Sequence, residues 1–233
     1  MDVSLAERGA DVWEKVTQAG RVVAGILPGG PFRFGTVDVR GVPTRVFLNL
    51  PDALGQYTRQ WFDKYAQRDW LVYGEKRVTF REARRMYLAL GMALRGDRFN
   101  IQPGDRVGIV MRNYPEFLLA FLGVTAVGGV AVPLNSLWVA EELEYGVRDA
   151  ACKVLICDPE RLDRASKFVT NMGIKTILCQ SNGWLGDKST VTMTWEDAIL
   201  IGNRYIAHVV RAGGTTDKLE DSMLKSIKPE DEA

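Results

Sequence analysis

The stretch from Arg106 to Asn135 constrains the fold more than any other part of this 233-residue chain. It begins with the apolar run Val107–Met111, continues into an apolar segment that starts at Pro115, and ends with the apolar run Val130–Leu134. Proline is favoured at the first position of a helix, so the middle segment predicts a helix between two strands. Strands without polar alternation are typical of a parallel sheet that helices cover on both faces.

Two further apolar runs, Val154–Cys157 and Thr176–Leu178, extend this pattern. The centres of the four runs recur about every 23 residues, which is the cadence of successive βα units. Between them, Glu141–Val147 and Leu162–Val169 have the spacing of amphipathic helices, whereas the helix over Leu118–Val124 is apolar nearly all round and is expected to be central. The sequence therefore predicts an α/β fold with a mostly parallel sheet flanked by helices.

The residues before this region predict a small β-hairpin and two helices. Trp70–Tyr73 and Val78–Phe80 are short apolar runs on either side of a polar turn that contains a glycine, as in a hairpin. Thr79 followed by Glu82 has the pattern of a capping box, which begins a helix. An earlier helix is expected over Leu54–Tyr65, where aromatic residues recur at helical spacing.

The two ends of the chain are less regular. We divide the sequence into an N-terminal extension (1–45), a domain (46–205) and a polar tail (206–233). The extension has a pattern typical of an amphipathic helix around Leu5–Val16. A short helix is expected from Trp195 to Ile201, and the polar, charged residues beyond it predict a loose C-terminal tail.

The composition excludes several classes of protein. Thirty basic residues against 29 acidic ones leave a net charge of +1, so nothing favours nucleic acid as a partner. No apolar run reaches the roughly 20 residues that a transmembrane helix needs, and the N-terminal residues lack a signal pattern. Cys152, Cys157 and Cys179 form no CxxC pair and are expected to be buried, reduced thiols. These features predict an intracellular, cytoplasmic protein without a transmembrane segment, and they indicate no particular organelle.

The sequence offers no catalytic residue, no cofactor-binding residue and no metal-binding residue. His208 is the only histidine, and neither an HExxH nor a G-x-S-x-G pattern occurs. After the first strand, Arg112–Pro115 contains none of the glycines that let a dinucleotide pyrophosphate approach the backbone. Gly128–Gly129 precedes a strand and indicates close helix-to-strand packing. Gly213–Lys218 lacks the Gly-Lys-Ser/Thr order of a phosphate loop and predicts an ordinary turn.

Several motifs resemble those of a known family, the AMP-binding, acyl-adenylate-forming synthetases. Val78–Ala83 is similar to the family's "L-T-Y-x-E-L" motif, and Gly128–Asn135 is similar to its "A-G-x-x-x-V-P-L-N/D" motif. Trp195–Asp197 resembles a segment that often precedes the family's nucleotide loop, and Lys228–Ala233 resembles the "P-x-D-x-A" lead-in to that loop. The similarity covers roughly residues 47–202 and the last half dozen residues.

This resemblance implies a partial N-terminal subdomain of an adenylate-forming enzyme. The family joins a carboxylate to ATP as acyl-AMP and then transfers the acyl group to a thiol, usually that of CoA. Asn135, where adenylation domains more often have Asp, favours acyl-CoA synthetases such as fatty-acid–CoA ligases. The full-length family uses ATP, Mg²⁺, CoA and a carboxylic acid such as a fatty acid.

This sequence departs from the family in one decisive respect. The family's "T-S-G-T-T-G-x-P-K-G" phosphate loop and its C-terminal domain with the catalytic lysine do not occur in these 233 residues. None of the family's cofactors is therefore expected to bind this chain well, and the chain is expected to be inactive on its own.

Whether the chain is itself an enzyme stays open. The first hypothesis is an N-terminal fragment of an acyl-CoA synthetase-like ligase, and it predicts that the coding sequence continues beyond Ala233 into a Thr/Ser/Gly-rich loop. The alternative is a noncatalytic α/β binding or interaction module derived from that family, with an exposed sheet edge where strand partners are missing. An unrelated α/β oxidoreductase is the remaining alternative. The acyl chain length, membrane association and the oligomeric state cannot be read from the sequence.

Overall fold

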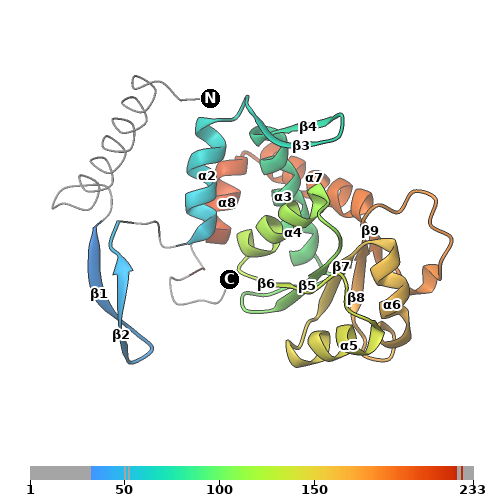
Figure 1. The fold of residues 1–233 in the computed structure, drawn as a ribbon. Helices are drawn as coiled ribbons and strands as arrows, with labels where there is room; N and C mark the ends of the chain where they lie inside the picture. Colours follow the sequence, from blue (N-terminus) through green and yellow to red (C-terminus); the bar gives the residue numbers. More distant parts are fainter. Residues whose placement is uncertain (1–32, 50, 52, 225–226, 228–233) are drawn as a thin grey trace, which may run out of the picture. The chain divides into compact units, whose positions relative to one another are not determined.

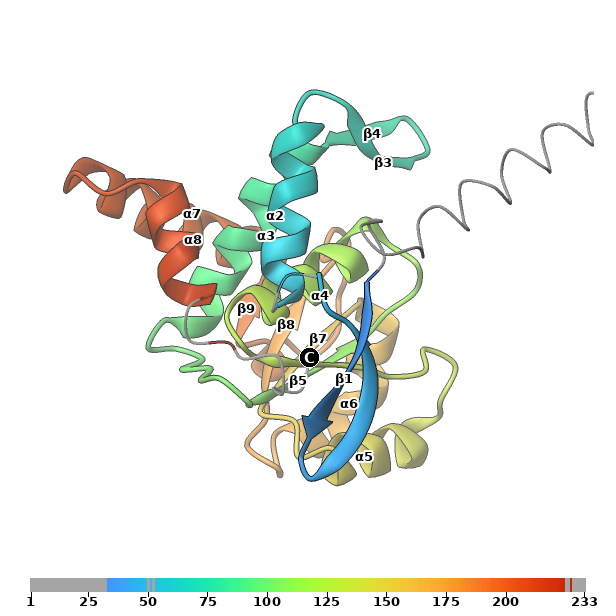
Figure 2. The same cartoon turned by 90° about the vertical axis from the view of Figure 1, so that its left-hand side faces the viewer.

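The computed structural model of the chain describes residues 33–49, 51, 53–224 and 227. They belong to two compact units, Met1–Pro51 and Asp52–Ala233. Figure 1 shows the elements of each unit, and Figure 2 shows them turned by 90°. The helix predicted around Leu5–Val16 and the motif at Lys228–Ala233 lie outside the described residues. The division into segments 1–45, 46–205 and 206–233 stays a prediction.

The described part of the first unit is an antiparallel hairpin of β1 (Phe34–Val39) and β2 (Val42–Phe47). Arg40 has φ 53° and Gly41 has φ 82°, which is the left-handed conformation that a two-residue hairpin turn requires at both positions. The Asp38 carboxylate supports the turn by accepting a hydrogen bond of 2.8 Å from the Gly41 N–H. This hairpin was not predicted, because its apolar alternation is short and interrupted by a proline in β2.

The second unit is built on a five-stranded sheet in the order β6-β5-β7-β8-β9, and every neighbouring pair is parallel. The strands are β5 (Arg106–Val110), β6 (Val130–Pro133), β7 (Val154–Cys157), β8 (Lys175–Leu178) and β9 (Met193–Thr194). The four apolar runs are thus confirmed as parallel strands. Strand β9 was not predicted, because two residues are too short to show a periodicity.

Helices cover both faces of this sheet, as predicted. The helices are α2 (Leu54–Lys64), α3 (Phe80–Arg95), α4 (Pro115–Ala126), α5 (Ala140–Asp149), α6 (Pro159–Val169), α7 (Trp195–Arg211) and α8 (Thr216–Leu224), with a 3-10 turn at Lys188–Thr190. Val154 and Ile156 of β7 face the core formed with α3, α4 and α7, whereas Leu155 and Cys157 face the core formed with α5 and α6. Successive residues of a strand point to opposite faces, so one apolar strand supplies both cores.

Helix α4 is only partly as central as its sequence suggests. Leu119 and Val124 are fully buried between the sheet and α3, but Leu118 is 47% exposed. Most of α4 is enclosed, as its apolar sequence predicts, but one side of the helix is exposed to solvent although it carries an apolar residue.

The predicted hairpin and capping box are confirmed. Strands β3 (Asp69–Tyr73) and β4 (Lys76–Thr79) pair antiparallel and lead directly into α3. The Thr79 hydroxyl accepts a hydrogen bond from the Glu82 N–H at 3.2 Å, and the Glu82 carboxylate accepts one from the Thr79 N–H at 2.8 Å. Helix α3 ends just before Gly96, as expected.

Helix α3 packs closely between α4 and α7 because glycines face it from both sides. A Cβ atom at Gly202 of α7 would overlap the carbonyl oxygen of Ala89, and one at Gly123 of α4 would lie 2.9 Å from the carbonyl oxygen of Tyr87. Only a residue without a side chain allows the two helix backbones to approach so closely. These contacts position the whole helical layer over the sheet.

The prediction of a loose C-terminal tail is wrong for residues 216–224, and the helix predicted over Trp195–Ile201 is longer than expected. Helix α7 continues to Arg211, and α8 follows after a short turn. Met223 and Leu224 of α8 are buried in the unit. The charged residues of α8 hid its apolar stripe in the sequence, but most of those charges pair with arginines of α2 and α3, as described below. Within the described ranges, no helix combines the length and apolar character needed to cross a bilayer.

Candidate functional site

The candidate site is a crevice at the carboxyl edge of the sheet, where the chain reverses its direction of winding at β5. Ligands of open α/β sheets bind outside the carboxyl ends of the strands at such a switch point. The crevice has a volume of about 420 Å³. Its lining residues come from the β3–β4 hairpin and from the loops after β5 and β6: Tyr73, Arg112, Asn113, Tyr114, Ser136 and Leu137. We call this the carboxyl-edge crevice.

The lining of the crevice combines aromatic rings with polar groups. The rings of Tyr73 and Tyr114 meet edge to face with centroids 6.1 Å apart. Arg112 and Asn113 are exposed beside them and present a guanidinium and an amide to the solvent. This set can hold a flat or anionic group, but the described lining contains no histidine, carboxylate or thiol that could act as a base or nucleophile.

A buried ion pair behind the crevice organises its loops. Asp158 follows β7 and accepts a hydrogen bond from the Arg112 N–H at 3.0 Å, on the loop after β5. The same carboxylate accepts from the Arg161 N–H at 3.1 Å, and so caps α6. The Arg161 guanidinium lies 3.2 Å from the Asp158 carboxylate, and both side chains are 2% exposed.

Arg161 extends this connection to the third loop. Its Nε donates a hydrogen bond of 2.8 Å to the carbonyl oxygen of Ser136, after β6. Its Nη2 is buried without a hydrogen-bond partner in the described part of the chain. One ion pair therefore ties together the loops that follow β5, β6 and β7, and these three loops form the carboxyl edge.

The same contacts leave little room for a phosphate at the switch point. Dinucleotide folds bind a pyrophosphate with free backbone N–H groups at the start of the helix after the first strand. Here the Arg112 N–H donates to Asp158, the Tyr114 N–H donates to the Arg112 carbonyl oxygen at 2.6 Å, and Pro115 has no N–H. The backbone N–H groups of Arg112 and Tyr114 are therefore already bonded within the protein, and this turn lacks the glycines of a dinucleotide-binding turn.

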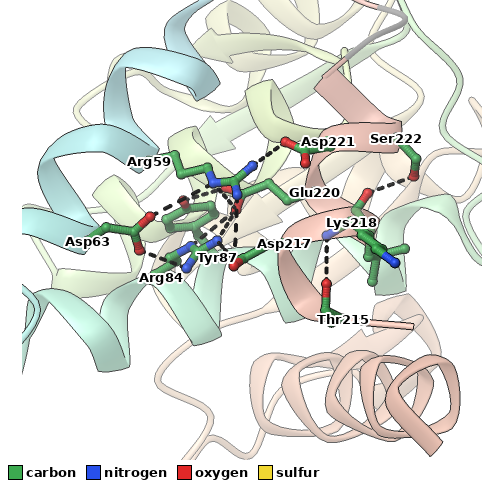
Figure 3. A network of polar contacts seen from close by, with 11 residues as sticks. Arg59, Asp63, Arg84, Tyr87, Thr215, Asp217, Lys218, Glu220, Asp221 and Ser222 are labelled. Carbon is green, nitrogen blue, oxygen red and sulfur yellow. Dashed lines mark hydrogen bonds and ion pairs between the residues drawn. The ribbon is translucent and has the colours of Figure 1, made fainter. Parts of the chain in front are cut away.

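A second cluster of charged residues joins α2, α3 and α8 (Figure 3). Glu220 of α8 is 1% exposed and accepts hydrogen bonds from Arg84 Nε at 3.1 Å and from the Tyr87 hydroxyl at 3.1 Å. Arg59 of α2 lies 3.8 Å from the same carboxylate. We call Arg59, Arg84, Tyr87 and Glu220 the α8 lock.

The electrostatics of the α8 lock indicate a structural role. Burial raises the pKa of Tyr87 well above its usual value, and the neighbouring charge of Glu220 adds to that effect. Burial would lower the pKa of Arg84, but its hydrogen bonds to Glu220 and Asp217 raise the pKa overall. Both shifts favour the ordinary charge states of Tyr87 and Arg84 at neutral pH, so neither residue is poised to transfer a proton.

The cysteines are placed as the sequence predicted. Cys152, Cys157 and Cys179 are free thiols and are buried. Burial raises the pKa of Cys152 to about 11, and burial likewise raises the pKa of Cys157 and Cys179 above their ordinary range. Protonated, enclosed thiols are poor nucleophiles, which fits a packing role.

No site forms around the single histidine. His208 is exposed on α7 and does not line the carboxyl-edge crevice. Among the described residues, no group of three or more histidine, cysteine, aspartate or glutamate side chains could hold a metal ion. The expectations of no catalytic, cofactor-binding or metal-binding residue stay predictions.

The two glycine segments have the structural roles that were expected. Gly213 has φ 86° in the turn between α7 and α8, and the Lys218 N–H donates to the Thr215 hydroxyl at 3.1 Å, which begins α8. Gly128 has φ 78° after α4, and a Cβ atom at Gly129 would lie 3.0 Å from Val124. These are a turn and a close helix-to-strand contact.

Asp158, Arg161 and Glu220 were not predicted as functional or structural key residues. A signal for the first two was present, because Asp158 ends an apolar strand and precedes Pro159, which is a helix-start pattern. Arg161 three residues later completes the pair. No local signal marked Glu220, because its partners lie on α2 and α3, far away in the sequence.

The comparisons with known proteins agree with this architecture. The model of the family described as "AMP-binding enzyme" matches residues 58–213. A long-chain-fatty-acid–CoA ligase of Bacillus subtilis (strain 168) is 34% identical over 109 residues, which are 47% of this chain and 19% of the ligase. A 3-hydroxybenzoate–CoA/4-hydroxybenzoate–CoA ligase of Thauera aromatica is 35% identical over 92 residues, or 40% of this chain and 17% of the ligase.

Solved structures show the same fold. The crystal structure of the anthranilate CoA ligase AuaEII with anthranoyl-AMP superposes with a TM-score of 0.58 at 23% identity, covering 65% of this chain and 29% of that protein. The region matched in the two curated relatives is less than a fifth of their length. The family match covers more than half of this chain, and its α/β sheet has the fold of the adenylate-forming enzymes. This chain therefore belongs to the AMP-binding enzyme family and corresponds to its N-terminal part.

Proposed function

We propose that this chain supplies the N-terminal part of an ATP-dependent acyl-CoA synthetase-like ligase. The observation that carries the proposal is the family match over residues 58–213, which contain the complete five-stranded sheet. Two relatives named as CoA ligases, one for long-chain fatty acids and one for hydroxybenzoates, support a carboxylic acid as the substrate class.

In the complete ligase, ATP and Mg²⁺ would activate the carboxylate as acyl-AMP, and CoA would then take the acyl group. The role proposed for the residues of this chain is to form one rigid side of the substrate-binding site of the ligase. The Asp158–Arg161 pair holds the loops of the carboxyl edge in place, and preorganised loops of this kind position substrates on many α/β folds. An intracellular location is part of the proposal, and the free, buried thiols support it.

The isolated chain is proposed to be inactive. Phosphoryl chemistry needs groups that cradle and neutralise phosphate charge. The observation that supports inactivity is the missing phosphate-loop motif.

The first test compares the purified chain with the Bacillus subtilis ligase in a pyrophosphate-release assay with ATP, Mg²⁺, CoA and a series of fatty and hydroxybenzoic acids. Calorimetry with ATP and Mg²⁺ measures binding directly. The expected result is background pyrophosphate release and no saturable ATP binding by the chain. Release above background, or a measurable ATP affinity, would show that the inactivity proposal is wrong.

The second test asks whether these residues can serve as the N-terminal part of an active ligase. In a chimera, the 109 matched residues of the Bacillus subtilis ligase are replaced by those of this chain. We expect a folded chimera that still forms acyl-AMP, at a reduced rate because contacts to the rest of the ligase differ. A chimera that folds and binds ATP but forms no acyl-AMP contradicts the proposed role.

A further inference from the structure

The outer groove between α3 and α7 has the chemistry of a binding site that the proposed function does not use. Its volume is about 670 Å³, within the range of small-molecule sites. It is lined by α3, α7 and the start of α8, and it shares no lining residue with the carboxyl-edge crevice. Its apolar lining consists of the accessible Ile206, Ala207 and Val210 and the almost completely buried Leu88, and its basic lining consists of Arg81, Arg84, Arg85 and Arg211.

Three of the four arginines, Arg81, Arg85 and Arg211, form no ion pair with an acidic side chain in the described part of the chain. Arg84 is occupied by Glu220 and Asp217 in the α8 lock. In the described part of the chain, Arg85 has neither a hydrogen-bond nor an ion-pair partner, although it interacts electrostatically with Glu82 on the same helix. Such exposed guanidiniums can bind a carboxylate through two parallel hydrogen bonds.

The remaining two arginines make only neutral contacts. The Arg81 guanidinium donates to the side-chain amide oxygen of Gln67 at 2.6 Å, in the amide orientation that satisfies both groups. The Arg211 Nε donates to the carbonyl oxygen of Ala207 at 3.2 Å. Their positive charges therefore also remain available to an anion in the groove.

The groove is long and its two ends differ. The two helices run antiparallel along the groove. Gly202 of α7 contacts Ala89 of α3, and from this contact the lining residues follow α7 forwards to Arg211 and α3 backwards to Arg81. Its α7 wall extends from Asn203 to Arg211, a distance of about 12 Å at the rise of an α-helix. Leu88 therefore lies towards one end, and Arg81 and Arg211 lie towards the other.

We propose that this groove binds an aliphatic carboxylate, with the head group between Arg85 and Arg211 and the chain along Ile206, Ala207 and Val210. An inorganic anion would leave the apolar floor unused. A protein partner needs roughly 800 Å² of contact on each side, which four apolar side chains cannot provide. A single hydrocarbon chain with one anionic end can contact the apolar lining with its chain and the arginines with its head group.

The test is a calorimetric titration of the full chain with monomeric decanoate, below its aggregation concentration. We expect saturable binding at one site, with an affinity that rises about fourfold for each methylene between octanoate and decanoate. Decanol is expected to bind at least about tenfold more weakly, because it lacks the charge-assisted hydrogen bonds. The cationic decyltrimethylammonium is expected not to bind.

Matched variants locate the site. Arg85→Gln combined with Arg211→Gln should weaken decanoate binding by about tenfold or more, and Ala207→Leu should also weaken binding by filling the floor. Arg148→Gln, the same change on the exposed face of α5 and outside the groove, should leave the affinity unchanged. All these positions are exposed, so unchanged circular dichroism melting is the check on folding.

Three results would overturn the proposal. The first is no binding of decanoate by the unmodified chain. The second is equal affinity in the double variant and the Arg148→Gln control. The third is binding to phosphatidylglycerol vesicles without binding of monomeric decanoate, which would assign the basic surface to a membrane instead.

Discussion

The guanidinium of Arg161 lies 3.2 Å from the carboxylate of Asp158, and both side chains are almost completely enclosed. The two residues are only three positions apart, yet their hydrogen bonds reach the loops after β5 and β6. Enclosing two charges is costly unless each is paired and hydrogen-bonded. Asp158 meets that condition, since it also accepts two backbone N–H groups, whereas the Nη2 of Arg161 has no hydrogen-bond partner among the described residues.

We predict that Asp158→Asn destabilises the chain by about 1–3 kcal/mol, because Arg161 then keeps only the half-exposed Glu160 carboxylate as an ion-pair partner and loses its buried one. The measurement is the free energy of unfolding from urea denaturation. The matched control is Glu144→Gln, which breaks the solvent-exposed pair with Arg148 and should cost at most about 1 kcal/mol. Equal losses in the two variants would show that the buried pair has no special structural role.

A second prediction concerns the α8 lock. Glu220→Gln should destabilise the chain by about 3 kcal/mol and speed amide hydrogen exchange in α8 above all other helices, because Arg84 and Tyr87 lose a buried charged acceptor. The control is Asp221→Asn, whose side chain is 51% exposed where it contacts Arg59, and which should cost at most about 1 kcal/mol. Unchanged exchange in α8 after Glu220→Gln would argue that the apolar contacts of Met223 and Leu224 hold this helix unaided.

The third prediction tests the close crossing of α3 and α7. In an exposed helix, Gly→Ala stabilises by roughly 0.5–1 kcal/mol through helix propensity. At Gly202 the new methyl group would overlap the Ala89 carbonyl oxygen, so Gly202→Ala should instead destabilise by about 1–3 kcal/mol. Adding Ala89→Gly should not restore stability, because the atom in contact belongs to the backbone. Thermal and urea unfolding measure both variants, and a stabilised Gly202→Ala chain would contradict the described crossing.

The fourth prediction is a pH dependence. Burial raises the pKa of Cys152 from its ordinary value of 9.0 to about 11. Between these values the folded chain keeps the thiol proton that the unfolded chain loses, so the contribution of Cys152 is fully present below pH 9.0 and is lost as the pH rises towards about 11. The free energy of unfolding should therefore fall over this range. Cys152→Ala should show a smaller fall between pH 8 and 10.5, and identical pH profiles of the two chains would show that this thiol does not contribute.

Much of the second unit could be predicted because its signals are local. The apolar runs at Val107–Met111 and Val154–Cys157 became parallel strands, and Thr79 and Glu82 formed the capping box, since each signal depends on residues only a few positions apart. The two-residue strand β9 was missed because it has no period of its own. The helix α8 was missed because its charged residues concealed the apolar contacts of Met223 and Leu224.

Patterns among neighbouring residues were enough to predict the fold class, the family and the absence of a glycine-rich phosphate turn after β5, because strand period, helix caps and motif order are local properties. Which charges are buried together became clear from the three-dimensional arrangement alone. Arg84 meets Glu220 across 136 positions, and Asp158 meets the Arg112 N–H across 46. Such contacts depend on how the strands are ordered and how the helices cross, and no local pattern encodes either.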